Sequence, residues 1–148
     1  MEELKKIIHP VEVNTFLTEY FEKKHLHITN RSETYYHDYL NSDIINSLLS
    51  DKIQYHPDTK LVKLIDDKVE TAPATLKDSN IIDVKLLMKY FSEGYTLVLN
   101  SLHKKMPSLW AYANAMSHFF GCVFQTNVYI TPGGEQQGFN IHHDTHDV

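Results

Sequence analysis

Two apolar segments of strand character, residues 95–100 and 122–131, enclose a segment with helical periodicity that starts at Pro107 and stops before Gly121. The flanking segments are rich in β-branched and aromatic residues, which fit strands. Between them, apolar residues recur three and four positions apart and predict one buried helix face. Proline suits a first helical turn, and glycine suits the position after the last. This strand–helix–strand unit predicts a mixed α+β fold.

The second strand segment, residues 122–131, carries different chemistry on its two faces. Alternate residues of a strand share a face. The even-numbered face is mostly apolar, whereas the odd-numbered face becomes polar toward its end through Gln125, Asn127, Tyr129 and Thr131. Such a polar face either lines a ligand pocket inside a barrel or lies against solvent. The pattern leaves both readings open.

Shorter elements are expected before this unit. Leu26 to Thr29 alternates like a short strand, Ser42 is placed to cap the next helix, and Asp83 to cap the one that ends before Gly94. The expected elements are a helix over 10–24, a strand over 26–29, a helix over 42–50, strands over 53–55 and 61–65, turns at 56–58 and 66–68, an irregular stretch over 70–80, and a helix over 84–91.

Composition limits the class of protein. With 148 residues, 42% of them apolar, the chain suffices for one domain with a modest core. A net charge of −5 disfavours nucleic acid and anionic membrane as direct partners. We expect a cytoplasmic protein, because Cys122 has no second cysteine to pair with and the first residues lack the order of a signal peptide. Cys122 is expected as a small buried apolar residue, and Trp110 as a helix-surface anchor.

The most reactive residue types gather near the end of the sequence. If residues 139–148 form a strand, then His142, Asp144 and His146 share one face. An imidazole beside a carboxylate supplies two of the three ligands of the two-histidine, one-carboxylate site that holds non-haem Fe(II). The Cα atoms of His142 and His146 would lie about 13 Å apart along a strand, so that pair is not expected to share one metal.

The third ligand therefore has to come from elsewhere. No histidine earlier in the sequence is marked as a ligand by its neighbours, and His25 and His27 suit a surface or edge strand. The alternative interpretation of residues 139–148 is a solvated, histidine-rich tail without a metal site. The open candidates are His9, His25, His27, His37, His56, His103 and His118.

Several of these segments together resemble the JmjC-type cupin proteins, and more narrowly their ribosomal-oxygenase branch. The resemblance covers most of the chain in the family's order, with a loop over 133–137 about one residue longer than usual. It rests on Phe16 to Ile28, Thr96 to Asn100 with His103, Gln125 to Pro132, Gln137 to Phe139, and His142 to Val148.

The resemblance implies an Fe(II)- and 2-oxoglutarate-dependent oxygenase built on a double-stranded β-helix, the cupin or jelly-roll fold. It implies that His142 and Asp144 are iron ligands and that Asn127 and Tyr129 line the pocket of the co-substrate. Residues 1–148 would form the N-terminal portion of one such domain, with 1–94 as a lead-in of helices and strands and 95–148 as the first jelly-roll strands.

The family's basic residue for 2-oxoglutarate and its distal histidine ligand are expected beyond Val148. The jelly roll is therefore expected to be truncated at its C-terminal side, and the 148-residue chain by itself to bind iron weakly and to lack turnover. The implied reaction is hydroxylation of a protein side chain, with histidine or arginine of a ribosomal protein as the suggested target. The alternative is a non-catalytic cupin-like module that binds a metal or a partner. Oligomeric state stays open, although family members often form homodimers.

Overall fold

The computed structural model describes residues 2–50, 59–76 and 81–142. Four antiparallel strands form one sheet in the order β2-β1-β3-β4, and helices pack around it, so the chain is α+β as expected and compatible with part of a cupin fold. Along the chain the elements are α1 (Glu2–Ile8), α2 (Val13–Thr15), the π-helical turn η1 (Phe16–Tyr20), α3 (Ser42–Ser50), β1 (Thr59–Ile65), β2 (Lys68–Ala72), α4 (Val84–Ser92), β3 (Thr96–Leu99), the 3-10 turn η2 (Leu102–Lys104), α5 (Pro107–Phe120) and β4 (Val128–Ile130).

The sheet has one face toward the main core. Leu97 on β3 lies opposite Leu61 on β1 and Ile130 on β4, and these side chains share the core face. Leu87 of α4, which is fully buried, joins the same cluster, and partly buried side chains of α3 pack against it. Val98 lies opposite Tyr129 and points to the other face of the sheet. The sheet thus separates an apolar core from a second face, to which β4 contributes Tyr129.

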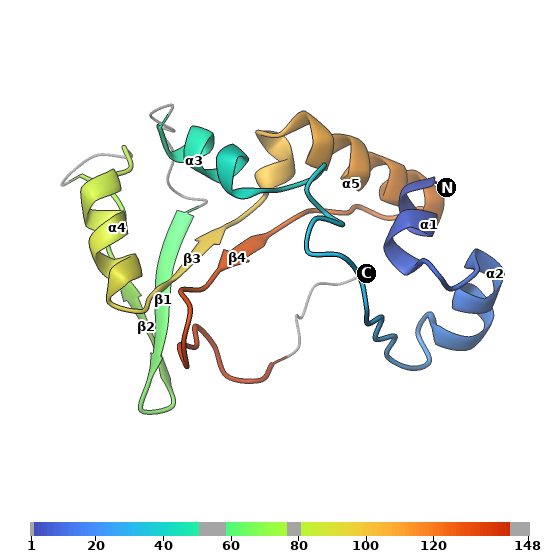
Figure 1. Ribbon diagram of the computed structural model, residues 1–148, viewed down its shortest axis with the longest axis horizontal. Helices are drawn as coiled ribbons and strands as arrows, with labels where there is room; N and C mark the ends of the chain where they lie inside the picture. The colour runs from blue at the N-terminus through green and yellow to red at the C-terminus, as the bar shows by residue number, and fades with distance from the viewer. Residues whose placement is uncertain (1, 51–58, 77–80, 143–148) are drawn as a thin grey trace.

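A smaller cluster holds the N-terminal helices. Leu4 and Ile8 of α1 pack with Met116 near the end of α5. Figure 1 shows α1 and α2 at one end of the molecule and the β1–β2 hairpin with α4 at the other, with α5 reaching toward α1. Helix α5 therefore links the two clusters, since its first half packs on the main core and its last half on α1.

Three predicted elements are confirmed, and each begins and ends close to the predicted residues. Helix α5 begins at Pro107, and Gly121 follows it with φ +70°. Asp83 caps α4 by accepting a hydrogen bond from the Leu86 backbone N–H at 3.1 Å. Strand β3 lies where the strongest strand pattern predicts it. Each of these elements carries its start and stop signals within its own sequence.

The N-terminal predictions need correction. The helix expected over 10–24 is shorter, covering Val13 to Tyr20, and a separate helix, α1, precedes it. Acidic residues in the first turn of α1 and basic residues in its last turn complement the helix dipole, a signal that would have identified it. The segment 26–29 is not a strand, because no described strand pairs with it. Asn41 rather than Ser42 caps α3, through a bond from the Ile44 N–H at 2.9 Å.

The hairpin and the second strand segment also differ from expectation. Residues 68–72 form β2, although a turn was expected at 66–68 and an irregular stretch over 70–80. Asp66 and Asp67 both adopt positive φ (48° and 61°) and make a two-residue hairpin turn, which places β2 beside β1. The strand expected over 122–131 shrinks to Val128–Ile130, because its partner β3 ends at Leu99. Cys122 is partly buried rather than fully buried. The strand expected over 53–55 and the turn at 56–58 lie outside the described residues.

Candidate functional site

A groove of about 480 Å³ lies on the face of the sheet that carries Tyr129. Strands β3 and β4 form one wall, and the chain after β4 turns back to form the other (Figure 1). Its lining is rich in hydroxyl, amide and imidazole groups, and it contains no lysine or arginine among the described residues. The lining residues are Thr96, Tyr129, Thr131, Gln136, Gln137, Gly138, Phe139, Asn140, Ile141 and His142.

Close packing at Gly138 fixes the returning segment against the sheet. Gly138 is buried, and a Cβ atom added there would lie 2.7 Å from Thr96 Oγ1, so only glycine fits without displacement. Thr96 is 2% exposed, and its hydroxyl lies 3.0 Å from the Thr131 hydroxyl. One residue earlier, the carbonyl of Gln137 accepts the backbone N–H of Leu64 at 2.8 Å, beside β1. These contacts hold the backbone that leads to His142.

A row of rings runs along the groove to His142. Tyr129 lies edge-on to Phe139, with ring centroids 5.8 Å apart, and Phe139 lies 5.5 Å from the His142 ring. Nδ1 of His142 lies 2.7 Å from the backbone oxygen of Asn140. A carbonyl oxygen only accepts, so this bond places a proton on Nδ1, and in the neutral ring the lone pair then sits on Nε2. Histidine ligands of metals show this arrangement, with the other ring nitrogen held by a carbonyl.

Asn127 has a different position from the one the alternation suggests. Its Oδ1 accepts the backbone N–H of Ser101 at 2.9 Å, and Asn127 is not among the residues that line the groove. The N–H of Ser101 needs this acceptor where the chain leaves β3, because Ser101 has left-handed φ (+50°). Tyr129, in contrast, is half-exposed and lines the groove. The assignment of both residues to the co-substrate pocket stays a prediction.

The residues next to Asn127 form a clamp between two segments. Thr126 donates its N–H to His103 Nδ1 at 3.2 Å, and its hydroxyl accepts the His103 N–H at 3.0 Å. Its carbonyl accepts the N–H of Leu102 at 2.9 Å. We call these bonds between residues 102–103 and Thr126 the β4 clamp, since they fix the chain just before β4.

The predicted metal site is described in part. His142 lies exposed on an irregular bend rather than on a strand, and Asp144 and His146 lie outside the described residues. Among the candidate third ligands, His103 is held in the β4 clamp, and His56 also lies outside the described residues. Within the residues described, no three His, Cys, Asp or Glu side chains gather as a metal set. The remaining candidates are exposed on the surface: His9, His25, His27, His37 and His118.

Sequence reasoning did not assign Thr96 or Gly138 to the site, and it placed Thr131 only on the polar face of residues 122–131. Thr96 and Gly138 sit in segments assigned to a strand and a loop, and neither carries a reactive group that would draw attention. The available signal was the polar odd face of residues 122–131, which includes Thr131 and so pointed to a polar neighbour on β3.

Among the described residues, no helix has the length and apolar content needed to span a membrane.

Comparison with known proteins finds distant relatives that share one class of activity in their names. No protein-family model matches the chain. It is 25% identical over 147 residues to the bifunctional lysine-specific demethylase and histidyl-hydroxylase NO66 of Dictyostelium discoideum, with 98% of this chain and 27% of the relative covered. It is 26% identical to NO66 of Aedes aegypti, with 93% and 21% covered, and 26% identical to ribosomal oxygenase 2 of Bos taurus, with 97% and 31% covered.

The chain is therefore a distant homologue of the JmjC-type ribosomal oxygenases, as its motifs predict. It spans about a quarter of the length of the relatives named above. The names of these relatives describe oxygenases and hydroxylases, and the α+β architecture of this chain is compatible with part of a cupin fold.

Proposed function

We propose that this chain forms part of the catalytic domain of an Fe(II)- and 2-oxoglutarate-dependent oxygenase that hydroxylates a protein side chain. The observation that carries the proposal is the groove that runs from Thr96 and Tyr129 to His142. The names of the relatives, histidyl-hydroxylase and ribosomal oxygenase, support histidine and a ribosomal protein as the target. Arginine is the other side chain that we propose. A cytoplasmic location and a homodimer are part of the same proposal.

The groove fits a small polar co-substrate. Its volume, about 480 Å³, lies within the range of about 300–1,000 Å³ typical of small-molecule sites. The hydroxyls of Thr131 and Tyr129 and the side-chain amides of Gln136 and Asn140 offer hydrogen-bond donors to a carboxylate. The role of Tyr129 in this proposal is to line the co-substrate site, and that of Asn127 is to hold the chain that leads to β4.

The imidazole of His142 fits a metal ligand of this class. Its Nδ1 contact with the Asn140 carbonyl orients the ring and leaves Nε2 as the coordinating atom. Asp144 is proposed as the carboxylate ligand. When bound, iron and 2-oxoglutarate would supply the activation of O2 that hydroxylation of a C–H bond requires. The chain's own residues orient the co-substrate and shield one side of the site.

The test is conversion of 2-oxoglutarate to succinate with added Fe(II), measured for this chain and for any longer reading frame that contains it. We expect turnover in the longer protein and its loss, by at least about a hundredfold, in His142→Ala and Asp144→Ala, because each removes a metal ligand. Lys85→Ala, at an exposed position of α4, is the control and should retain activity.

Unchanged turnover in both ligand variants would refute the ligand assignment. Metal binding without succinate formation in every form of the protein would favour the alternative, a non-catalytic cupin-like module. Chelation followed by restoration with Fe(II) or with Zn(II) separates the two, since only the oxygenase should recover activity with Fe(II) alone.

A further inference from the structure

Thr96 and Thr131 form a cross-strand pair in the groove that contains Tyr129, and we call them the threonine pair. Leu97 lies opposite Ile130 where β3 pairs with β4, and the next position of this antiparallel register places Thr96 opposite Thr131. Both residues line the groove, and their hydroxyl oxygens lie 3.0 Å apart. Thr131 is exposed, whereas Thr96 is 2% exposed. One residue of the pair is therefore enclosed by protein, and the other borders the open groove.

Burial decides which hydroxyl of the threonine pair is the donor. Among the described residues, Thr131 is the hydrogen-bond partner of the Thr96 hydroxyl, and Gly138 closes the space beside it, since a Cβ there would lie 2.7 Å from Thr96 Oγ1. A buried hydroxyl proton without an acceptor is unfavourable, so the Thr96 hydroxyl donates to Thr131. The Thr131 oxygen accepts this bond, and its own proton then points away from Thr96. Thr131 thus presents a hydrogen-bond donor to the groove.

The groove around Thr131 suits a ligand that accepts hydrogen bonds. A carboxylate only accepts, so it is complementary to a hydroxyl whose proton points outward. Among the described residues, the lining contains no aspartate or glutamate, and no fixed negative charge there repels an anion. The hydroxyl of Tyr129 and the side-chain amide of Gln136 belong to the same lining and add further donors. The lining therefore provides donors without a competing carboxylate.

We propose that Thr131 determines specificity for the co-substrate by donating its hydroxyl proton to a carboxylate, and that Thr96 is a positioning residue that fixes the direction of this bond. The inference rests on the proposed function, because the co-substrate named there, 2-oxoglutarate, carries two carboxylates. A freely rotating hydroxyl loses orientational freedom when it binds a ligand. In the threonine pair the proton is directed before the ligand arrives, which lowers that cost. Thr96 acts on the ligand through Thr131 and makes no bond to it.

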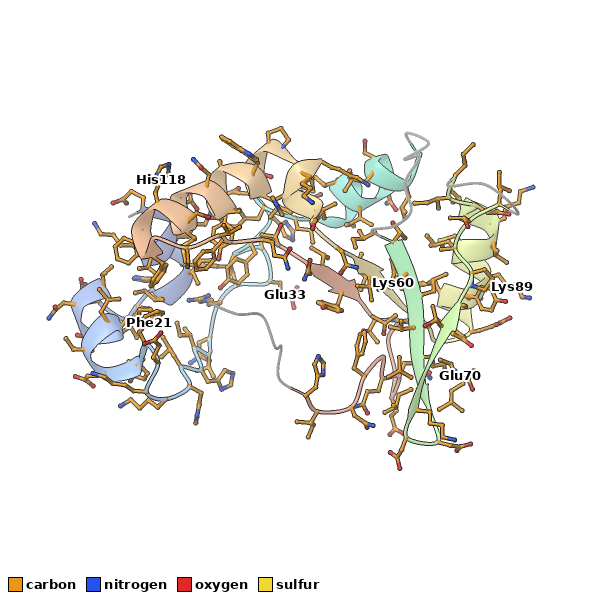
Figure 2. All side chains as sticks on the ribbon, turned by 180° about the vertical axis from the view of Figure 1, so that it is seen from behind. Phe21, Glu33, Lys60, Glu70, Lys89 and His118 are labelled. Carbon is orange, nitrogen blue, oxygen red and sulfur yellow. The ribbon has the colours of Figure 1, made fainter. Side chains whose placement is uncertain are left out.

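A second groove, of about 420 Å³, provides an internal comparison within the same molecule. Phe21 and Arg31 are among its lining residues, and general attraction of anions to a positive charge would appear there. Figure 2 shows Phe21 at the opposite end of the molecule from Glu70 of the β1–β2 hairpin, beside which the segment after β4 returns. The two grooves share no lining residue, so binding at one is distinguishable from binding at the other.

The experiment titrates the purified, metal-free chain with glutarate and follows the backbone amides by NMR. Glutarate has the two carboxylates of 2-oxoglutarate without the keto oxygen, so its binding does not require a metal. We expect the amides of β3 and β4 to shift and those around Phe21 to stay unchanged. Thr131→Val should weaken glutarate binding by at least about tenfold, because hydrogen bonds to charged groups are among the stronger ones. Thr131→Ser keeps the hydroxyl and should bind nearly as the parent does.

A double-mutant cycle tests whether Thr96 acts through Thr131. Thr96→Val should weaken glutarate binding by about threefold, because the Thr131 hydroxyl then samples its three staggered orientations. Thr96→Ser should restore the binding. In the Thr131→Val background, Thr96→Val should cause no further loss, whereas a merely structural role of Thr96 would make the two losses additive. A thermal melt of each variant verifies that folded protein is compared.

Three results would overturn the proposal: no glutarate-induced shift at β3 and β4, equal glutarate affinity in Thr131→Val and the parent, or additive losses in the double variant. None of them decides the oxygenase reaction, which is tested by succinate formation with Fe(II) and its loss in His142→Ala. Conversely, absence of succinate in every form of the protein would overturn the oxygenase, while the expected glutarate results would still support the carboxylate site at Thr131.

Discussion

Gly138 and Thr96 are in close contact in the groove that contains Tyr129. The addition of one carbon atom at Gly138 would create a steric clash with the Thr96 side chain. We predict that Gly138→Ala destabilises the protein by about 1–3 kcal/mol, because the new Cβ would lie 2.7 Å from Thr96 Oγ1 in a buried position. Gly133→Ala is the matched control, since nothing lies within 4 Å of a Cβ at that position. Urea denaturation measures both, and equal midpoints would contradict the close packing at Gly138.

One of the three bonds of the β4 clamp depends on a single side-chain atom, Nδ1 of His103. We predict that His103→Leu destabilises the protein by about 1–3 kcal/mol, because the N–H of Thr126 loses its acceptor in a partly buried place. His103→Asn should recover most of that loss, since its amide oxygen can lie near the former Nδ1 position. Denaturation of the three proteins checks this. If His103→Leu and His103→Asn were equally unstable, the His103 ring would stabilise the protein by packing rather than by accepting a hydrogen bond.

At the scale of elements, helix α4 begins where the Asp83 side chain accepts the N–H of Leu86. We predict that Asp83→Ala lowers the free energy of unfolding by about 1 kcal/mol, and that Asp83→Asn, which retains the acceptor, costs much less. Thermal and urea denaturation compare the two. Equal effects of both substitutions would show that charge rather than capping matters here.

The same scale explains why some strands were shorter or longer than their patterns indicate. Residues 122–127 have strand-like alternation but do not form a strand. The backbone N–H and C=O of Thr126 are hydrogen-bonded to residues 102–103, and β3, the neighbouring strand, ends at Leu99. In contrast, β2 has a weak pattern and is nevertheless a strand, because the Asp66–Asp67 turn places it beside β1. A strand exists where a partner lies alongside, which local pattern does not reveal.

At the scale of the whole molecule, Tyr39 joins the two cores. Its ring lies 5.6 Å from that of Tyr112 on α5, and its hydroxyl donates to a carboxylate oxygen of Glu3 on α1. Burial, followed by the hydrogen bond and charge of Glu3, raises the pKa of Tyr39 well above its usual value near 10. Burial likewise raises the pKa of Tyr112. Both rings favour the protonated form in the folded state.

This gives a prediction for alkaline pH. Below pH 10 the contribution of Tyr39 is fully present; above it, the unfolded chain loses the proton first, so stability falls as pH rises toward the raised pKa of the folded state. Tyr39→Phe should flatten the decline of unfolding free energy above pH 10. Urea denaturation between pH 8 and pH 11 compares this variant with the parent, and an identical slope in the parent and Tyr39→Phe would contradict the assignment.

The amino-acid sequence by itself determined the elements with signals at their own ends. Pro107 and Gly121 mark α5, Asp83 marks α4, and the dense β-branched run marks β3. The sequence also indicated the distant relationship to the JmjC-type ribosomal oxygenases. Each motif is a short run of residues that can be recognised without the tertiary structure. The assignment of His142 as a ligand remains a prediction, and so does that of Asp144.

Tertiary structure decided which residues meet. It joined Asn127 to Ser101, brought Thr96 to Gly138, and placed Arg31 beside a groove that no motif indicates. Each of these outcomes depends on hydrogen bonds and packing between segments far apart along the chain. Such contacts form only when both segments have reached their final positions, so the periodicity of either segment could not foretell them.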